Sequence, residues 1–377
     1  MEPSKQKRKV PFINRIIIIL NLLAVFALCL SYLSSYIPPS SFLMLPFAGL
    51  AYPYILLLNL VFIIFWLLSK KRFALISIIA ILLGWNQLGR LVRINPSSSE
   101  NLEVHQTKVL SYNIQNFLNI NAANTKYVDD FSNEKNIIEF IKTQNADIIC
   151  LQEMLYDRES PETFPDKLGH KFNCPNYYYE NYYISRKKID AIATFTRHKI
   201  IENGHLEFEG KSIGIFNDLL IKDDTVRVYN LHLASIHLKK EDYEFMSDIS
   251  NQKESDNFKA STQNIISKLK QAYLKRARQA NEVTNHISAC KYPVIICGDL
   301  NDTPLSYVYE EVSNNLKDAF VQSGSGFGAS YAGDDFPSLR IDYIFHDKQF
   351  SSTNFKTHKI FLSDHFPISS VLYMDTK

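Results

Sequence analysis

The sequence predicts an α/β domain with a mixed system of β-sheets, preceded by a membrane anchor. Long apolar runs fill the first hundred residues, whereas the rest alternates short strand-like runs with helix-period segments. Charge divides at the same place: residues 1–99 hold ten Lys or Arg and one acid, a net +9, so in a chain of net +2 the remainder carries −7. Such an acidic body does not favour tight binding to long nucleic acid, which depends on basic contacts with phosphates.

Three apolar segments predict the anchor. They cover residues 16–33, 42–68 and 73–88, and none has a polar face. Each is close to the roughly 20 residues that cross the hydrocarbon core of a bilayer. A cleaved signal peptide is the alternative for the first segment, which has a basic start and an apolar middle. Because two more segments follow, we expect residues 1–95 to form an anchor with three transmembrane helices in either case.

The orientation of the anchor follows from its basic residues. Residues 5–9 and 70–72 are basic and favour the cytoplasm, and the loop at 38–41 is uncharged. Three crossings from a cytoplasmic start place residue 100 onward outside, although Arg90 and Arg93 on that side count against it. We therefore expect a multi-pass protein of the cytoplasmic membrane, with its body on the outer (periplasmic or extracellular) side.

The body begins after a linker at residues 96–103, which is rich in Ser, and is expected to span residues 104–377. Its first elements form a strand, helix, strand unit, and a hairpin follows later. In chain order the expected elements are a strand at 108–114, a helix at 134–142, and strands at 146–151, 191–196, 213–221 and 225–233.

The second part of the body is predicted to hold a surface insertion, one long helix and three more strands. Residues 237–262 are charged and poorly periodic, whereas 266–287 carry an apolar stripe with basic residues elsewhere, typical of a core-packed helix with a solvated face. Residues 324–328 are Gly-rich, but no strand precedes them, so we interpret them as a mobile loop. The remaining strands are expected at 293–297, 340–345 and 368–373. Five cysteines without paired spacing predict neither a disulfide framework nor a zinc site.

Polar residues stand at the ends of several predicted strands. In the stretch ICGDLND, Asp299 and Asn301 point the same way because strand side chains alternate. Gly and Asp also form ordinary turns, so this stretch alone is weak evidence for chemistry. The same pattern recurs in other strands: Asn113 in SYNIQ, Glu153 in ICLQE, His232 in YNLHL, Asp342 in RIDYIF, and Asp364 and His365 in LSDHFPI.

Each of these residues has an ordinary structural explanation, but the set together is what metal-assisted cleavage of a phosphoester requires. The ordinary explanations are a solvated strand end for Glu153, a satisfied polar side chain for His232, a turn for Asp364, a surface pair with Arg340 for Asp342 and a cap for Asn113. Magnesium takes oxygen ligands and is usually held by one or two carboxylates. The attacking water and the charge on phosphorus need the other groups. No nucleophile elbow, Walker loop or dinucleotide fingerprint is present.

The ordered motifs SYNIQ, LQE, NLHL, GDLND, RIDY and SDH resemble the endonuclease/exonuclease/phosphatase family. They extend from Asn113 to His365 and include none of the anchor. The resemblance implies a four-layer sandwich, with two mixed β-sheets face to face and helices outside, and an active site where strand ends meet. With the anchor, the expected fold is this α/β sandwich preceded by three transmembrane helices.

The resemblance also implies a metal site. Glu153 is similar to the family's main metal ligand, with Asn113 beside it. Asp364 resembles the carboxylate that assists the metal. The implied ion is Mg²⁺, with Mn²⁺ as an alternative.

The resemblance implies catalytic roles for five further residues. Asp299 and Asn301 resemble the pair that orients or activates the attacking water and holds the phosphate. His365 is similar to the family's base or phosphate-stabilising histidine, with Asp342 fixing its tautomer. His232 resembles a second histidine that donates toward the phosphate or leaving oxygen. The family supports that second histidine with an acid, for which Glu180 is the candidate here.

The resulting prediction is a membrane-anchored, metal-dependent phosphodiesterase or phosphatase. A non-catalytic membrane module that binds a phosphorylated ligand is the alternative from another class, and an outward-facing nuclease is the alternative among enzymes. The motifs do not select a substrate, so a lipid headgroup, a nucleic acid or a small phosphoester remains open. The bilayer is the expected partner, and no protein partner is implied.

Overall fold

The computed structural model describes residues 12–95, 106–117, 133–157, 163–184, 188–236, 241–242, 245, 258–332 and 339–374. The predicted linker, residues 96–103, and most of the predicted insertion lie outside these ranges. The chain forms two compact units, Met1–Gly89 with Leu305–Tyr307, and Arg90–Pro304 with Val308–Lys377.

The first unit is made of apolar helices. Two are long and apolar enough to cross a membrane, α1 (Phe12–Leu33) and α3 (Tyr52–Ser69), and the short α2 (Leu45–Leu50) lies between them. The second predicted segment is thus divided, because Pro46 and Pro53 each stand in the first turn of a helix. Outward-facing leucines and isoleucines cover these helices, as expected of surfaces that face lipid.

The third predicted segment is bent rather than straight. It consists of η1 (Lys71–Phe73), α4 (Ala74–Leu83) and α5 (Trp85–Leu91), with a bend of 70° at the break. Ten residues of α4 rise about 15 Å, half of a typical hydrocarbon core. The structure therefore contains two candidate spans, or three if the bent pair forms one span.

Buried polar side chains join the helices of this unit. Asn21 of α1 donates to Ser77 of α4, which in turn donates to Asn59 of α3, and Trp66 Nε1 donates to Asn21. In an apolar environment such hydrogen bonds hold helices together where hydrophobic contacts provide little specificity.

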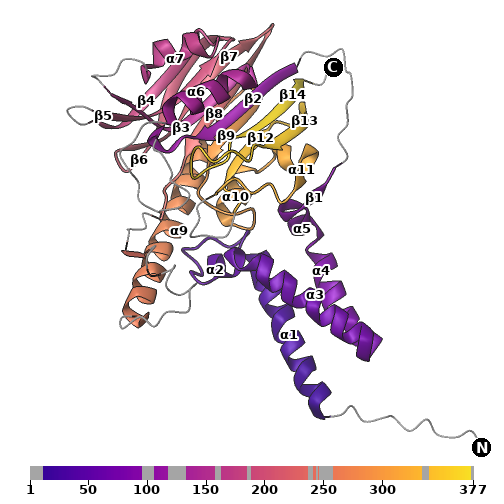
Figure 1. The fold of residues 1–377 in the computed structure, drawn as a ribbon. Coiled ribbons are helices and arrows are strands. Elements are labelled where there is room, and N and C mark those ends of the chain that lie inside the picture. The colour runs from indigo at the N-terminus through magenta and orange to yellow at the C-terminus, as the bar shows by residue number, and fades with distance from the viewer. Residues whose placement is uncertain are drawn as a thin grey trace, which may run out of the picture. The chain divides into compact units, whose positions relative to one another are not determined.

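The second unit contains two six-stranded sheets, both mixed (Figure 1). In spatial order, the first sheet consists of β13 (Phe350–Thr357), β14 (Ile368–Met374), β2 (Gln106–Asn113), β3 (Ile148–Asp157), β5 (Lys188–Thr196) and β4 (Asn176–Ile184). The second consists of β10 (Lys317–Asp318), β12 (Asp342–His346), β9 (Val294–Asp299), β8 (Asp224–His232), β7 (Lys211–Ile221) and β6 (Lys199–Phe208). One central pair in each sheet, β2–β3 and β8–β9, is parallel.

Three apolar clusters show that the sheets and helices form four layers. Val109 and Cys150 of the first sheet pack with Val228 and Cys297 of the second, so the sheets meet face to face. The other face of the first sheet is covered by α6 (Asn133–Gln144) and α7 (Pro165–Lys171). The other face of the second is covered by α9 (Phe258–Ser288) and α10 (Tyr307–Val312). The predicted α/β sandwich is confirmed.

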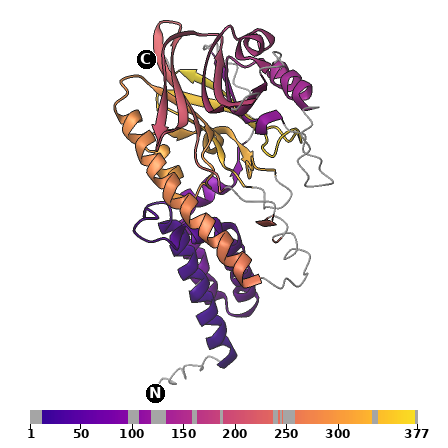
Figure 2. The same cartoon turned by 90° about the vertical axis from the view of Figure 1, so that its left-hand side faces the viewer.

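Several elements differ from the sequence prediction. The long helix α9 begins at Phe258, eight residues before the predicted stripe, and continues unbroken to Ser288 (Figure 2). The Gly-rich segment is not simply a loop, because β11 (Ser325–Gly326) pairs with β1 (Arg93–Ile94) in a small antiparallel ribbon. The strands β4, β6 and β13 were not predicted. All five cysteines are described and free.

Candidate functional site

Strand register brings three of the predicted residues side by side. His232, the last residue of β8, pairs with Asp299, the last residue of β9. On the other side of β9, Asp299 pairs with Asp342, the first residue of β12. Residues paired across neighbouring strands have their side chains about 5 Å apart. The order of strands in the second sheet therefore places Asp299 between the imidazole of His232 and the carboxylate of Asp342, at one edge of the sheet.

The first sheet delivers Asn113 and Glu153 to the same edge. Asn113 ends β2, and Glu153 lies in an irregularity of β3, where its φ is 50°. The Asn113 amide donates to Glu153 Oε1 and to Asp299 Oδ2, both at 3.2 Å. This buried amide therefore bridges a carboxylate of each sheet.

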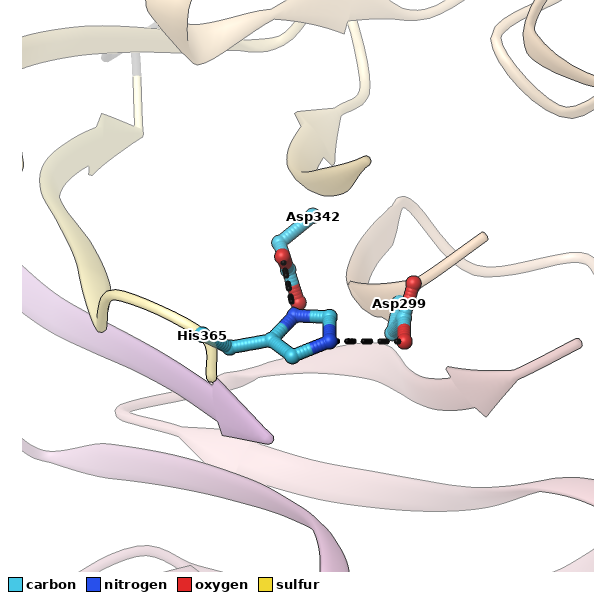
Figure 3. Close-up of side chains that lie close together, drawn as sticks. All are labelled: Asp299, Asp342 and His365. Carbon is cyan, nitrogen blue, oxygen red and sulfur yellow. Dashed lines mark hydrogen bonds and ion pairs between the residues drawn. The ribbon is translucent and has the colours of Figure 1, made fainter. Parts of the chain in front are cut away.

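His365 is held by Asp342. The segment before β14 carries His365, which forms a β-bridge with Tyr331, and the two rings pack edge to face. His365 Nδ1 donates to Asp342 Oδ2 at 2.8 Å, and Nε2 lies 3.7 Å from Asp299 Oδ2 (Figure 3). Asp342 thus pairs with His365 and not with Arg340, whose guanidinium binds Asp318.

Asn301 is locked beside Asp299. Its backbone N–H donates to Asp299 Oδ1 at 2.7 Å, and its amide donates to Asp299 Oδ2 and to the carbonyl of Leu233. The φ of Asn301 is 54°, a left-handed conformation that Asn adopts more readily than most residues. The short turn after β9 therefore fixes both side chains of the motif, and this turn, rather than the alternation of strand side chains that was expected, brings them together.

Asp364 is hydrogen-bonded by Gln115, a residue that the sequence analysis did not single out. Gln115 Nε2 donates to Asp364 Oδ2 at 2.9 Å, and the Asp364 backbone N–H donates weakly to Gln115 Oε1 at 3.4 Å. Gln115 and the next two residues form η2 (Gln115–Phe117), with φ values of 43°, 57° and 58°. The position of Gln115 two residues after Asn113 is the only sequence signal that could have found it.

The second histidine, His232, has Glu153 as its acidic partner. His232 Nε2 lies 3.3 Å from Glu153 Oε1 and 3.9 Å from Asp299 Oδ2. Glu180, the candidate from the sequence, instead contacts Tyr178 and His205. The expectation for Glu180 is therefore wrong, because β4 directs Glu180 toward β6 rather than toward the site. The ring beside His232 is Tyr182, at 5.9 Å between ring centroids.

Burial and neighbouring negative charges raise the pKa values of two carboxyl groups in the site. Burial and the neighbouring Asp342 raise the pKa of Asp299 to about 6, against the pull of His365 and His232. Burial likewise raises the pKa of Asp364 to about 7, with Glu153 and Asp299 adding to the effect. Two carboxyl groups of one site therefore titrate near neutral pH, a pattern associated with functional sites.

The pKa values of Glu153, His365 and His232 shift in the direction that favours the charged form of each side chain. Burial opposes the charge of Glu153, but the hydrogen bond and charge of His232 and the amide of Asn113 lower its pKa to about 2. Burial also opposes protonation of His365, yet Asp342 and Asp299 raise the pKa of its imidazole well above the usual value. The pKa of His232 is raised by Glu153 against the effect of burial.

The donor set fits a hard divalent cation. Three carboxylates, Glu153, Asp299 and Asp364, act on one another electrostatically, and oxygen ligands of this kind suit magnesium or manganese. The side chain of Glu153 keeps 31% of its surface exposed, so an ion can reach it from solvent. Asp299, Asp342 and His365 also offer ligand atoms within 4.8 Å of one another. Because His365 Nδ1 already binds Asp342, an ion held there would have to use Nε2.

Comparison with known proteins decides the family. The profile of the Endonuclease/Exonuclease/phosphatase family matches residues 110–365, which is more than half of the chain. The chain belongs to the endonuclease/exonuclease/phosphatase family. This family match covers every predicted site residue, from Asn113 to His365. The N-terminal residues 14–91 match a separate domain of unknown function, DUF8431.

The chain is similar to solved structures of this family at low sequence identity. An endonuclease/exonuclease/phosphatase from Beutenbergia cavernae is 17% identical, with a TM-score of 0.50, over 71% of this chain and 72% of that one. A family protein from Bacteroides thetaiotaomicron is 16% identical, with a TM-score of 0.49, over 73% of this chain and 100% of that one. A family protein from Leptotrichia buccalis is 17% identical, with a TM-score of 0.48, over 71% and 100%. No curated protein gave a significant match.

Proposed function

We propose that this protein is a membrane-anchored, divalent-metal-dependent phosphoesterase that cleaves a phosphodiester or phosphomonoester with an activated water. One observation carries the proposal: side chains from the end of β2, the end of β8, the turn after β9 and the segment before β14 meet around Asp299 Oδ2. Asn113, Asn301, His232 and His365 all lie within 3.9 Å of that oxygen. A purely structural carboxylate would not need two imidazoles and two amides from both sheets.

Asp299 is proposed to take the proton from the attacking water, with Asn301 holding the carboxylate in place. A general base works best when its pKa lies near the working pH, and the pKa of Asp299, raised to about 6, meets that requirement. Two donors from Asn301 fix both oxygens of this carboxylate. Asn301 thereby limits the carboxylate to one orientation toward the water.

His365 is proposed to stabilise the phosphate as a cation. Its raised pKa keeps the imidazole protonated at neutral pH, so Nε2 presents an N–H toward the site while Nδ1 is bound to Asp342. A donor fixed before the reaction stabilises developing negative charge without reorganisation. His232, whose pKa is also raised, is proposed to donate toward the leaving oxygen from the opposite side of Asp299.

The metal ligands are proposed to be Glu153, Asn113 and Asp364, with Mg²⁺ as the ion and Mn²⁺ as a substitute. When bound, the cation would neutralise negative charge on the phosphate. Glu153 is ionised at all physiological pH values because its pKa is about 2. Gln115 holds Asp364 at the same edge, and the Ser363 hydroxyl links Asp364 to the backbone of Asn113.

The anchor is proposed to comprise residues 1–95, followed by a linker at 96–103 and the catalytic domain at 104–377. We propose that the catalytic domain lies outside the cytoplasmic membrane. That orientation requires the bent pair of α4 and α5 to act as one span; a re-entrant pair would return the chain to the side of its N-terminus. The basic residues Lys70, Lys71 and Arg72 between α3 and α4 support a cytoplasmic loop at that point.

Alkaline phosphatase fused after residue 377 tests the orientation. Activity of the fusion supports the outer side, because that reporter folds only there. Activity of a cytoplasmic reporter fused at the same place would overturn the orientation and leave the chemistry unaffected.

The chemistry is tested with the full-length protein in detergent, with Mg²⁺ or Mn²⁺. The substrates are nucleic acid, phospholipid, sphingomyelin and soluble phosphomonoesters and diesters. We expect turnover of at least one class that EDTA abolishes and that Asp299→Ala or His365→Ala lowers at least about a hundredfold. Metal-dependent binding without turnover of any substrate would instead favour a non-catalytic module. Unchanged turnover in both variants would contradict the assigned roles.

A further inference from the structure

A buried tyrosine hydroxyl lies beside the second histidine. Tyr182 belongs to β4, the edge strand of the first sheet, and its ring packs against His232 at 58° between the ring planes. Its hydroxyl oxygen is buried and makes no hydrogen bond with any residue in the described part of the chain. A buried hydroxyl normally has a partner, because leaving one unpaired destabilises the protein. The position of Tyr182 therefore requires an explanation.

Two irregularities at the same level of the sheet direct Tyr182 to the site. The strands β3 and β4 flank β5, and Met154 of β3 and Asn181 of β4 both pair with Ala191. Beside this rung the register of each pairing shifts, at Glu153 in β3 and at Tyr182 in β4. A bulge leaves a residue out of the ladder and turns its side chain from the regular alternation. The two strands on either side of β5 therefore present Glu153 and Tyr182 at the same level of the sheet.

The charges around Tyr182 keep its hydroxyl protonated. Burial raises the pKa of Tyr182 well above its usual value, and the carboxylates of Glu153 and Asp299 raise it further. Such a hydroxyl is a poor source of a proton for a leaving group. It remains a hydrogen-bond donor throughout the pH range in which Asp299 can act.

We propose that Tyr182 is a further catalytic residue, whose hydroxyl donates a hydrogen bond to a non-bridging oxygen of the substrate phosphate. The inference rests on the proposed phosphoesterase function and assigns a substrate contact within that site. His232 and Tyr182 then have separate tasks, because the imidazole faces the leaving oxygen and the hydroxyl faces the phosphate. The missing partner of Tyr182 is the substrate.

The matched pair of variants is Tyr182→Phe and Tyr178→Phe. Each substitution removes one hydroxyl from β4 and keeps the ring. Tyr178 donates to Glu180 at 3.3 Å and has no place in the site, so it controls for effects on the strand. In the full-length protein in detergent with Mg²⁺, kcat and KM are measured on two phosphoesters that differ in the leaving group, one 4-nitrophenyl and one alkyl.

We expect Tyr182→Phe to lower kcat by about 10- to 100-fold, and by the same factor with both leaving groups, since the lost donor faces the phosphate. The Tyr178→Phe protein should keep the wild-type kcat within about twofold. A Tyr182→Phe protein with unchanged kcat would overturn the inference. A loss that is much larger for the alkyl ester would also overturn it, because the hydroxyl would then be acting as the acid for the leaving group.

Two further readouts separate this inference from the proposed function. Removing an unpaired hydroxyl should leave the melting temperature unchanged or raise it, so a drop of several degrees would reveal a structural partner and contradict the inference. Binding of inorganic phosphate with Mg²⁺, measured by calorimetry, should weaken about tenfold in Tyr182→Phe and not in Tyr178→Phe. If the wild-type protein turns over no substrate, the proposed function fails, and phosphate binding alone then tests whether the Tyr182 hydroxyl contacts phosphate. Equal phosphate binding by the three proteins, or no phosphate binding by the wild type, would then reject that contact.

Discussion

His365 Nδ1 lies 2.8 Å from Asp342 Oδ2, and both side chains are almost completely buried. The hydrogen bond fixes which nitrogen of the imidazole is directed to the carboxylate and leaves Nε2 facing Asp299. The backbone pairing of Asp342 with Asp299 across β12 and β9 places this histidine-binding carboxylate beside Asp299. In the proposed mechanism, Asp342 would therefore act on the phosphate through His365 rather than by contact.

Replacing Asp342 with Asn is expected to lower kcat by roughly 10²–10⁴-fold, because an amide can favour the wrong tautomer of a catalytic histidine. The protonated state of His365 should also be lost at a lower pH, since Asp342 is the first of the charges that raise the pKa of the imidazole. The kcat of the full-length protein, measured from pH 5 to 9, checks both effects. Asp223→Asn, in the exposed turn after β7, is the control. An Asp342→Asn protein with a wild-type pH profile would exclude this positioning role.

Replacing Glu153 with Gln is expected to weaken Mg²⁺ binding at least about tenfold, since an ionised ligand becomes a neutral one. The shape of the side chain is kept, and Asn113 can still pack against it. Calorimetric titration of the metal-free protein with Mg²⁺ measures the change. Glu139→Gln on the exposed face of α6 is the matched control and should bind as the wild type. Equal affinity in both variants would show that the ion, if any, binds elsewhere.

The candidate site residues could be predicted from the sequence, but their contacts could not. Asp299 and Asn301 are two residues apart in the chain, so the sequence predicts that they act together, although Asn301 lies in the turn after β9 and not on the strand. Nothing local shows that β9 lies between β8 and β12, which is what aligns His232, Asp299 and Asp342. The acid that contacts His232 could not be predicted either. Glu153 of β3 and Glu180 of β4 both belong to the other sheet, and only the arrangement of the strands in space brings Glu153 to His232.

The missed strands share a physical cause. The edge strand β6 reads KIIENGHLEF, in which exposed polar residues outnumber apolar ones and no alternation is visible. The tyrosines of β4 face both ways, some into the core of the first sheet and Tyr182 into the site, so they show no period-two pattern. Tertiary pairing rather than intrinsic preference determines such strands. The length and hydropathy of the apolar segments were sufficient to predict α1 and α3 as candidate membrane spans. They did not indicate the bend between α4 and α5.

The site groups Asp299, Asp364, His232 and His365 are expected to stabilise the metal-free protein less as the pH rises from 5 to 8. Burial lowers the pKa values of His198, His286, His346 and His358, which act in the opposite direction below about pH 6.5. A group whose pKa is higher in the folded than in the unfolded protein stabilises the fold below its unfolded pKa, and loses that effect as the pH rises through the folded pKa. Asp299, with a pKa of about 6, and Asp364, with a pKa of about 7, both lose their contribution in this range. The raised pKa values of His232 and His365 act in the same direction. Glu153 acts oppositely, but only below about pH 4.5, as its pKa is about 2.

Thermal unfolding of the full-length protein in EDTA, at pH 5, 6, 7 and 8, measures this trend. Added Mg²⁺ should raise the melting temperature more at pH 8 than at pH 5, because protons compete with the ion for the carboxylates. Asp364→Asn removes one of the titrating groups and should flatten the dependence in EDTA. If the melting temperature of Asp364→Asn in EDTA depends on pH as strongly as that of the wild type, the charge arrangement described here is contradicted.

Gln115 is expected to matter for metal binding although it carries no charge. Its amide is a donor to Asp364 Oδ2, and the left-handed backbone of η2 holds it in place. Gln115→Leu should weaken Mg²⁺ binding by about 10- to 100-fold, as the loss of a partner that orients a ligand typically does. It should also lower the free energy of unfolding by about 1–3 kcal/mol, because a buried carboxyl loses its hydrogen bond. Gln349→Leu on an exposed turn is the control, and both proteins are measured by Mg²⁺ calorimetry and by denaturation. If Gln115→Leu loses stability but binds Mg²⁺ like the control, then Asp364 is not a ligand of the ion.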